Sequence, residues 1–465
     1  MKFEPHQYQK DAISFLTGRL FGEQREGAGL FLDPGLGKTA ITLTTIDTLR
    51  SFGEVERVLV VAPLRPVYSV WPKEIEKWGF DLQFSIIHGT PTKRLKAMNQ
   101  AVDIHLINPE GLAWLAKQDH PTWDLMVVDE STKFKNWTAG RTKALRKLVG
   151  KIDRRIILTG TPAPNCVSDL FSQIFILDKG ETLGENITQF RKRYMKRGGY
   201  ENYKWLPKDE HVSGEIAKKT APVVLTMDAE DHLDMPEILY NDIRVHLSPG
   251  DHSDYKKLEQ KLFLELDSGH ELVASGAGSA YSMAKGFANG GVYETHDETR
   301  TTHQIHTEKL EAFADLVDEL QSKPCLVAFE FLHDLERIHS RFPNAPAIVG
   351  ATGPQTTDKY IEKFNKGELP MLLAQSSTIS HGMNMQESCN DIIWFGLTDK
   401  YEDYEQFNRR VYRQGVSGQV RVHHILTTGT VDEVRRARLD GKADRQKSLV
   451  ESLKEYKDAG GQVCR

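Results

Sequence analysis

Two short segments of the sequence carry residue types suited to nucleotide chemistry. Asp33–Thr39 reads Asp-Pro-Gly-Leu-Gly-Lys-Thr and follows the apolar run 28–32, whereas Asp129 and Glu130 follow the apolar run 125–128. A glycine-rich turn between a strand and a helix directs backbone N–H groups toward phosphate oxygens. An acidic pair at the end of a neighbouring strand can hold a divalent cation and activate water. Together the two segments predict a site that binds and hydrolyses a nucleoside triphosphate.

The residues of the glycine-rich loop are expected to bind the phosphates and the metal ion. The residues that would surround the phosphates are Pro34, Gly35, Leu36, Gly37, Lys38 and Thr39. The Lys38 ammonium would neutralise the β and γ phosphates, and the Thr39 hydroxyl would hold Mg²⁺. Leu32 stands where the general phosphate-loop pattern has its first glycine, but the two later glycines still allow the tight turn. The expected ligands are ATP and Mg²⁺.

The acidic pair completes this chemistry. Asp129 would share the Mg²⁺ ion, and Glu130 would act as the base that polarises the attacking water. Such a pair at a strand end is more often a feature of a helix N-terminus, but Lys38 upstream favours the catalytic interpretation. The next apolar run ends in Leu-Thr-Gly-Thr-Pro at 158–162, which on its own predicts only a strand exit and a turn.

Short apolar runs rich in branched residues recur along the chain and predict the elements that position these groups. The runs lie at 28–32, 58–62, 104–107, 125–128, 155–159, 325–329, 347–349, 371–374, 392–395 and 422–426. They are typical of strands buried on both faces, hence of parallel sheets. Helices are predicted between them at 72–78, with Pro72 in the first turn, at 308–320 and at 357–365. The fold class is therefore α/β, with two lobes of similar design.

The middle of the chain differs from both halves. Residues 183–305 hold basic clusters, few apolar runs and a Gly/Ser/Ala-rich stretch at 274–291. We expect an N-terminal lobe at 1–232 with a basic insertion at about 183–210, and a C-terminal lobe with a closing helix at 306–465. An inter-lobe crossing with a helical insertion would occupy 233–305, and Leu233–Leu239 would be exposed.

Composition narrows the class of protein. At 465 residues the chain suits two or three domains, and a 39% apolar and 27% charged content is typical of a globular protein. A net charge of −5 leaves room for a local basic groove. The four cysteines are too scattered for a structural zinc site or a disulfide framework. No apolar stretch is long enough to span a membrane, and no signal peptide is visible, so we expect a cytoplasmic protein.

The ordered motifs of the chain resemble those of superfamily 2 helicase and translocase ATPases, in particular the Swi/Snf-like group. The matching segments are 8–12, 33–39, 62–64 with 71–74, 108–112, 129–132, 158–165, 326–329, 380–386 and 406–415. Departures from the family pattern include Thr132 and Tyr412 in place of His, and Arg409 in place of Gly. Residues 3–435 are covered. The resemblance implies two RecA-like lobes, each a mostly parallel sheet flanked by helices, with helical insertions between them.

The resemblance also implies roles for residues outside the phosphate loop. Gln9 would recognise the adenine base. Thr159 and Thr161 would couple the ATP site to the nucleic acid on which the protein moves. Arg410 and Arg413 fall on the two family arginines. Three residues apart, they would share one helical face. They would stabilise the transition state when the lobes close on ATP, as arginine fingers do.

Contacts to nucleic acid are implied less directly. Arg65, Asn108 and Asn384, like Thr161, fall in motifs that the family places on the sugar-phosphate backbone. The segment 191–197, which includes Arg191 and Arg193, has five cations in seven residues. It would either contact phosphates or form a solvated helix face. For the basic segment 141–155 the solvated face is favoured.

Two further patterns favour structural interpretations. His423 and His424 are neighbours in a predicted strand, so their side chains point to opposite faces and would not share a metal ion. The tail 431–456 resembles the closing helix of the family. Its expected packing residues are Val434, Leu449 and Leu453, and its arginines at 435, 436 and 438 are expected to be solvated.

These observations predict an ATP-dependent motor on nucleic acid, with ATP hydrolysed in the cleft between two lobes. The Swi/Snf-like resemblance implies a translocase on double-stranded DNA, of the bare kind found in bacteria or phage-infected cells. Two alternatives stay open: a strand-separating helicase on DNA or RNA, and an ATP-gated clamp that hardly turns over. Partner proteins, polarity and oligomeric state are not predicted.

Overall fold

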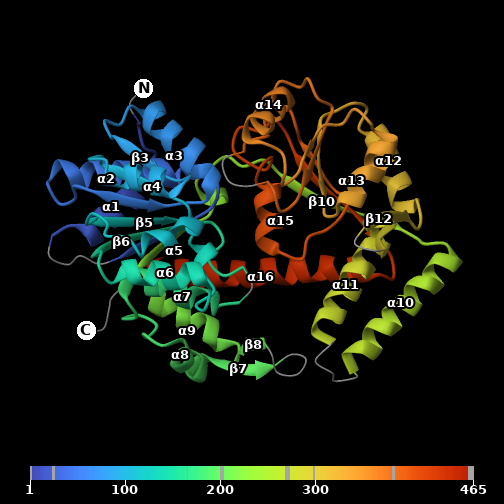
Figure 1. The fold of residues 1–465 in the computed structure, drawn as a ribbon, viewed down its shortest axis with the longest axis horizontal. Helices are drawn as coiled ribbons and strands as arrows, with labels where there is room; N and C mark the ends of the chain where they lie inside the picture. Colours follow the sequence, from blue (N-terminus) through green and yellow to red (C-terminus); the bar gives the residue numbers. More distant parts are fainter. Residues whose placement is uncertain are drawn as a thin grey trace. The chain divides into compact units, whose positions relative to one another are not determined.

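A computed structural model of the chain describes residues 3–22, 27–164, 166–198, 204–267, 273–296, 299–379 and 383–458. The chain divides into two compact units, which we describe separately. Unit 1 comprises Met1–Leu233 with Lys442–Arg465, and unit 2 comprises Asp234–Gly441. Figure 1 shows each unit as a sheet covered by helices.

Unit 1 is built on a seven-stranded, wholly parallel sheet. In spatial order its strands are β3 (Phe84–Ile87), β4 (Ile104–Ile107), β2 (Val58–Val61), β5 (Leu125–Asp129), β6 (Arg154–Thr159), β1 (Ala28–Leu32) and β9 (Val224–Met227). The five predicted runs are confirmed as strands, and four of them are buried along their whole length. The short edge strands β3 and β9 were not predicted.

Helices flank this sheet, and a small hairpin extends from it. The helices are α1 (Gln7–Leu20), α2 (Lys38–Ser51), α3 (Leu64–Trp78), α4 (Pro91–Met98), α5 (Leu112–Leu115), α6 (Gly140–Val149), α7 (Asp169–Asp178), α8 (Ile187–Tyr194) and α9 (His211–Thr220). Strands β7 (Met195–Gly198) and β8 (Lys204–Pro207) pair antiparallel between α8 and α9. The core contains Phe31, Phe134 and Phe171.

The start of α3 corrects the predicted position of Pro72. The helix begins at Leu64, with Pro63 as its N-cap, so Pro72 lies in its interior rather than in its first turn. A proline there removes the hydrogen bond to the carbonyl four residues earlier. The residue four positions earlier is Tyr68.

Unit 2 is built on a six-stranded parallel sheet. Its strands, in spatial order, are β10 (Ile238–Val245), β17 (Val420–Thr427), β16 (Asp391–Trp394), β13 (Cys325–Phe329), β15 (Met371–Gln375) and β14 (Ala347–Ile348). All five predicted runs are confirmed as strands. With unit 1, this confirms the α/β fold class of two mostly parallel sheets flanked by helices.

Helices and one hairpin surround the second sheet. The helices are α10 (Pro249–Asp267), α11 (Val273–Asn289), α12 (Glu308–Glu319), α13 (Leu332–Arg341), α14 (Pro354–Asn365), α15 (Tyr401–Asn408) and the first part of α16 (Val431–Asp458), which belongs to unit 2 up to Gly441. Strands β11 (Gly291–His296) and β12 (Thr299–Gln304) pair antiparallel. The predicted helices at 308–320, 357–365 and 431–456 are confirmed within a few residues of their ends.

The segment expected to cross between lobes is partly a strand. Ile238 and Leu239 open β10, which pairs in parallel with β17 along its full length. Most residues of β10 are exposed, as is usual for an edge strand. The sequence therefore contains no apolar run from which this strand could be predicted. No helix in the described part of the chain is long and apolar enough to cross a membrane.

Candidate functional site

The phosphate loop connects β1 to α2 in unit 1. Gly35 and Gly37 have φ angles of 98° and 81°, in the left-handed region that favours glycine. A Cβ at Gly37 would lie 2.6 Å from the Gln9 Nε2 atom. Leu32, at the position of the missing first glycine, is a fully buried strand residue. The turn therefore relies on the two later glycines, as the sequence predicts.

The loop residues fit a nucleotide phosphate. The Lys38 Nζ atom donates to the Leu32 carbonyl at 2.6 Å and to the Asp33 carbonyl at 3.3 Å, so the ammonium lies within the loop. Gln9 is buried, accepts from the His6 N–H at 2.9 Å and donates to the Leu36 carbonyl at 3.2 Å. These contacts place a cation at the phosphate turn and fix the glutamine beside it.

Strand register brings three predicted segments to one edge of the sheet. Phe31 in β1 is opposite Thr159 in β6, and Asp129 in β5 is opposite Leu158 in β6. A Cβ at Gly160 would lie 3.1 Å from the Pro34 Cδ atom. The phosphate loop, the acidic pair and the Thr-Gly-Thr turn thus follow the carboxyl ends of adjacent strands, where open α/β sheets bind ligands.

The acidic pair is held in an unusual backbone geometry. Glu130 has φ 54° and ψ 59°, which a side chain other than glycine rarely adopts. Asp129 accepts from the Trp71 indole N–H at 3.1 Å. Strained residues of this kind persist where the surrounding structure holds them, often at active sites. Trp71 on α3 thus orients the first carboxylate, a role that the sequence did not indicate.

A buried glutamine joins the acidic pair to the threonine turn. The Ser131 hydroxyl donates to the Gln173 Oε1 atom at 2.6 Å, and the Gln173 amide donates to the Pro162 carbonyl at 2.7 Å. The Thr161 N–H donates to the Thr159 hydroxyl at 3.1 Å. Gln173 lies on α7 and was missed by the sequence analysis, because nothing in its local sequence marks it.

The two arginines lie in unit 2, and one expectation about them is wrong. The helix α15 ends at Asn408, so Arg410 and Arg413 follow it in a turn and do not share a helical face. The helix stops because the backbone takes other partners: the Arg410 N–H donates to the Phe407 carbonyl, and the Arg410 carbonyl accepts from the Met385 N–H at 2.9 Å.

Both arginines contact the predicted motif around 380–386. The Arg410 guanidinium is 5% exposed and donates to the Gln406 carbonyl at 2.9 Å and to the Met383 carbonyl at 3.4 Å. Arg413 donates to the Asn384 side chain. Burial, with Arg409 nearby, lowers the pKa of Arg413. Residues 380–382 of this motif, and Asn165 of the motif at 158–165, lie outside the described residues.

Arg409, which replaces the family glycine, has partners of its own. Its Nε atom donates to the Glu405 carboxylate at 2.8 Å, and its guanidinium lies 5.0 Å from the centre of the Tyr412 ring. The two departures of this motif from the family pattern therefore contact each other and Glu405.

The predicted nucleic-acid residues are in different environments. Arg65 is half-buried on α3, and Asn384 is exposed. Asn108 is 6% exposed and donates to the Glu110 carboxylate at 2.7 Å, so it presents little surface to a polynucleotide. Arg193 is exposed and lies 3.3 Å from Glu215, whereas Arg191 stacks over the Trp205 ring at 5.2 Å.

The favoured reading of the basic segment 141–155 is only partly right. Arg141, Lys143 and Lys147 are exposed, as on a solvated face. Arg154 and Arg155 are 4% exposed. The Arg154 guanidinium pairs with Glu54, and the Arg155 guanidinium donates to the Leu177 and Ile152 carbonyls. These two arginines lie within β6, where burial requires them to be paired.

The two neighbouring histidines contact different carboxylates. The His423 Nε2 atom lies 3.1 Å from the Asp391 carboxylate, and the His424 Nδ1 atom lies 2.8 Å from the Asp242 carboxylate. The His424 Nε2 atom bonds the Tyr404 hydroxyl at 2.9 Å. Among the described residues, no group of three or more His, Cys, Asp or Glu side chains could hold a metal ion.

Two expectations about α16 are wrong. Val434, expected to pack, is 50% exposed. Arg435, expected to be solvated, is 1% exposed and lies 3.3 Å from Asp399. Arg436 pairs with Asp242 at 3.1 Å, and Arg438 is exposed as expected. The side chains of Leu449 and Leu453 lie outside the described residues.

Comparison with known proteins gives two family matches and several relatives. The model of the SNF2-related domain matches residues 8–284, and that of the helicase conserved C-terminal domain matches residues 308–415. Protein p41 of Acyrthosiphon pisum secondary endosymbiont phage 1 is 32% identical over 97% of this chain and 99% of its own length. YwqA of Bacillus subtilis, provisionally described as an ATP-dependent helicase/translocase, is 26% identical over 96% of this chain.

Other relatives are longer or more distant. Human ZRANB3, a DNA annealing helicase and endonuclease, is 22% identical over 96% of this chain. The chain spans only 48% of YwqA and 40% of ZRANB3. Among solved structures, the SWI2/SNF2 ATPase core of Sulfolobus solfataricus in complex with dsDNA is 23% identical, with a TM-score of 0.47 over 97% of this chain and 94% of that one.

Proposed function

The chain belongs to the family of SNF2-related proteins with a helicase conserved C-terminal domain, and from this premise we propose that it moves along double-stranded DNA by hydrolysing ATP. It is an ATP hydrolase that nucleic acid stimulates. The observation that best supports the proposed chemistry is the shared edge of β1, β5 and β6, which brings Lys38, Asp129 and Thr159 to one side of the sheet.

Residues of unit 1 bind ATP and activate the attacking water. Lys38 holds the β and γ phosphates, the loop N–H groups between Pro34 and Thr39 surround them, and Gln9 reads the adenine. Mg²⁺, when bound, neutralises charge on the phosphates, with the Thr39 hydroxyl and the Asp129 carboxylate as its protein ligands. Glu130 takes the proton of the attacking water. Its left-handed backbone sets the direction in which the Glu130 side chain leaves the main chain.

Unit 2 supplies the positive charge that stabilises the transition state of hydrolysis. Arg410 and Arg413 act on the γ phosphate in the transition state, as arginine fingers do. In the structure they contact the Met383 carbonyl and the Asn384 side chain, so these contacts exchange for phosphate oxygens during the cycle. Thr159 and Thr161 couple hydrolysis to nucleic acid. The next residue, Pro162, accepts a hydrogen bond from Gln173, which in turn accepts one from Ser131 beside the acidic pair.

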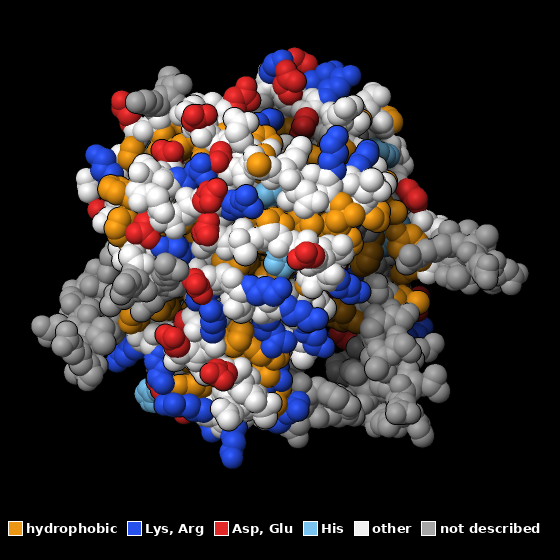
Figure 2. Space-filling model, turned by 60° about the vertical axis from the view of Figure 1, so that its left-hand side comes forward, with side chains coloured by type: hydrophobic (Ala, Val, Ile, Leu, Met, Phe, Trp, Pro, Cys, Tyr) orange, Lys and Arg blue, Asp and Glu red, His pale blue; other side chains and the backbone are white. Residues whose placement is uncertain are grey.

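Nucleic acid is gripped by its backbone rather than read by its bases. Arg65, Asn384 and Arg193 are the better-placed candidates, because their side chains are at least partly accessible. Asn384 would have to leave Arg413, and Arg193 would have to leave Glu215. Asn108 is buried against Glu110, and Arg191 lies over the Trp205 ring. Figure 2 shows Lys and Arg side chains gathered in clusters on one face, so local positive charge coexists with a net charge of −5. The 32% identity to a phage protein supports action in the cytoplasm of a bacterial or phage-infected cell.

Replacement of Glu130 by Gln tests the proposed chemistry. The variant Glu130→Gln should lower phosphate release by about 10²- to 10⁴-fold, the usual share of a general base, with ATP affinity retained. Lys38→Ala should lose both. Phosphate release is measured with duplex DNA, single-stranded DNA and RNA as stimulators. Glu76→Gln, at an exposed position on α3, is the matched control and should behave as wild type.

Two assays separate translocation from its alternatives. Displacement of a triplex strand without separation of a plain duplex supports the translocase, and duplex separation supports a helicase instead. Tight ATP-dependent binding with negligible phosphate release would identify a clamp. Wild-type turnover by Glu130→Gln would remove the assignment of the base.

A further inference from the structure

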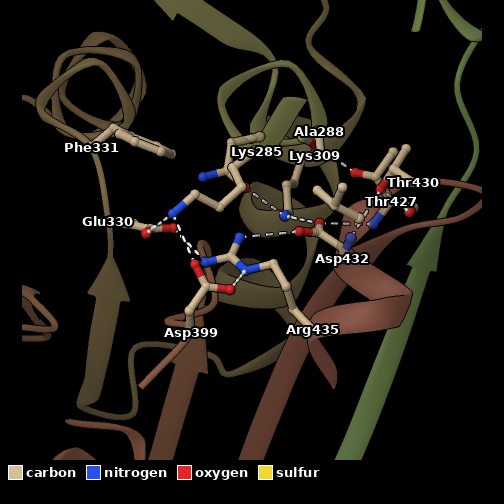
Figure 3. A network of polar contacts seen from close by, with 12 residues as sticks. Lys285, Ala288, Lys309, Glu330, Phe331, Asp399, Thr427, Thr430, Asp432 and Arg435 are labelled. Atoms are coloured by element: carbon tan, nitrogen blue, oxygen red, sulfur yellow. Dashed lines mark hydrogen bonds and ion pairs between the residues drawn. The ribbon is translucent and has the colours of Figure 1, made fainter. Parts of the chain in front are cut away.

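Six charged side chains meet beyond the carboxyl ends of the strands of unit 2 (Figure 3). They are Lys285, Lys309, Glu330, Asp399, Asp432 and Arg435. Three are cations and three are carboxylates, so the charges balance. They come from α11, α12, the residue after β13, the loop before α15, and α16. The cluster therefore joins five segments that are far apart in the sequence.

Lys285 occupies the centre of one half of this cluster. Its Nζ atom donates to the Glu330 Oε1 atom at 2.6 Å and to the Asp399 Oδ2 atom at 3.0 Å. The Tyr281 hydroxyl donates to the other oxygen of Asp399 at 2.8 Å. Tyr281, Lys285 and Asn289 are four residues apart in turn, and so lie on one face of α11. This face of α11 contacts the rest of unit 2 through polar groups.

Arg435 is the central cation in the other half of the cluster. It is 1% exposed, bonds the second oxygen of Glu330, and lies 3.3 Å from Asp399 and 3.6 Å from Asp432. Lys309, fully buried, donates to Asp432 at 2.6 Å. Burial by itself would raise the pKa of Asp399. The cations Arg435 and Lys285 outweigh this effect and hold the pKa below its ordinary value. Glu330 and Asp399 thus each contact two cations, Lys285 and Arg435.

Stability alone does not account for this arrangement. Buried ion pairs are often no more stabilising than apolar side chains of the same volume, although removing one partner leaves an uncompensated charge. The cluster instead fixes where its side chains lie, because each ion pair holds a particular carboxylate in place. The carboxylate of interest is Asp399, which two cations and the Tyr281 hydroxyl hold at once.

Asp399 stands two residues before the helix that leads to the arginines. α15 runs from Tyr401 to Asn408, directly before Arg409 and Arg410. The helix is fixed again at Tyr404, which bonds His424 at 2.9 Å, and at Asn408, which accepts from the Trp394 indole at 3.0 Å. Asp399 thus lies next to the first of three contact points that set the position of α15, and the turn at Arg410 follows that helix directly.

We propose that Lys285 of α11 is a positioning residue for ATP hydrolysis: through Asp399 it sets the start of α15 and hence the placement of Arg410 and Arg413. The proposal rests on the proposed role of these two arginines. It assigns to the helical insertion a part in catalysis that requires no contact with ATP or DNA.

The test compares Lys285→Met and Lys285→Arg in the full chain. Lys285→Met keeps the unbranched chain but removes the ammonium. We expect it to lower kcat of duplex-stimulated phosphate release by roughly ten- to a hundredfold, the scale on which small misplacements act, with KM for ATP within about twofold of wild type. Lys285→Arg should recover most of kcat, because it restores a cation between the two carboxylates.

A control and a coupling test accompany these variants. Lys256→Met removes a lysine of α10 that pairs only at the surface, with Glu259 at 2.6 Å, and should leave kcat unchanged. The double variant Lys285→Met with Asp399→Asn should be no slower than the slower single variant, because Lys285 acts through Asp399. If Lys285→Met fails to fold, Tyr281→Phe, which removes only the hydroxyl bonded to Asp399, takes its place and should still lower kcat with KM unchanged.

The outcomes separate this proposal from the function on which it rests. Wild-type kcat in a folded Lys285→Met protein, or a loss that Lys285→Arg does not recover, would overturn the positioning role. If Arg410→Ala itself leaves turnover unchanged, the role of the arginines fails, and the role of Lys285 fails with it. A slow Arg410→Ala beside a normal Lys285→Met overturns only the present inference.

Discussion

At the scale of single residues, the phosphate loop depends on backbone angles that only glycine adopts easily. Gly37 combines a φ of 81° with a neighbour, the Gln9 Nε2 atom, that lies 2.6 Å from where its Cβ would be. A side chain here is therefore excluded for two independent reasons. The sequence showed the glycine, but the contact with Gln9 became visible only in the fold.

Gly37→Ala should weaken ATP binding and destabilise unit 1. A left-handed residue other than glycine costs roughly 1–2 kcal/mol, and displacement of Gln9 adds to this. Equilibrium unfolding in urea and titration with a fluorescent ATP analogue measure the two effects. Adding Gln9→Ala should relieve the steric part, so that the double variant binds ATP analogues more tightly than Gly37→Ala. Equal affinity in the two variants would speak against the contact.

At the scale of elements, the sequence predicted the central strands well and the chain between them poorly. Runs such as 58–62 and 325–329 were recognisable because both faces of a central parallel strand are apolar. Edge strand β10 carries Asp242 and Arg244 and gave no such signal. Arg435 looked solvated because its partners, Glu330 and Asp399, lie far away in the sequence. Long-range polar pairs leave no periodic pattern.

The same reasoning explains which parts of the candidate site could be predicted. The phosphate loop and the acidic pair follow β1 and β5 directly, so their local sequence was enough. The end of α15 was misplaced because Arg410 takes Met385 as its backbone partner, which the local sequence does not reveal. Gln173 was missed for a similar reason, since its importance comes from Ser131 and Pro162.

Gln173→Met should separate the acidic pair from the threonine turn. Met has a similar length but cannot bond the Ser131 hydroxyl or the Pro162 carbonyl, so the free energy of unfolding should fall by roughly 1–3 kcal/mol. Stimulation of phosphate release by duplex DNA should fall as well, with ATP affinity retained. Gln118→Met removes a bond to the Trp114 carbonyl nearer the surface and serves as the control. Undiminished stimulation would show that the link carries no coupling.

At the scale of the whole molecule, both units bury histidines in their neutral form. His105 in unit 1 and His306 and His424 in unit 2 have pKa values lowered from 6.5, mainly because burial disfavours the charged ring. His105 also accepts a hydrogen bond from the Trp123 indole at 3.2 Å, which a protonated ring could not do. Carboxylates facing His306 and His424 oppose this effect without reversing it.

The stability of the chain should therefore fall in mild acid. The unfolded chain takes up protons near pH 6.5, and the native histidines do so only at lower pH, so stability is complete above pH 6.5 and is lost as the pH falls through the native pKa values. Urea unfolding at pH 7.5, 6.5 and 5.5 measures this slope. His105→Asn should flatten it for unit 1, whereas replacement of the exposed His211 should not. A slope of the opposite sign would contradict the lowered pKa values.

The buried partners of Arg435 also set an order of events during synthesis. Glu330 and Asp399 are synthesised before residue 435, and until that residue is added, Lys285 is the only cation of the cluster that can pair with them. At about 5–20 residues per second, the nascent chain spends several seconds in this state. Unit 2 thus completes this cluster only after residue 435 is added, and ribosomes stalled before that residue should expose a proteolysis-sensitive intermediate.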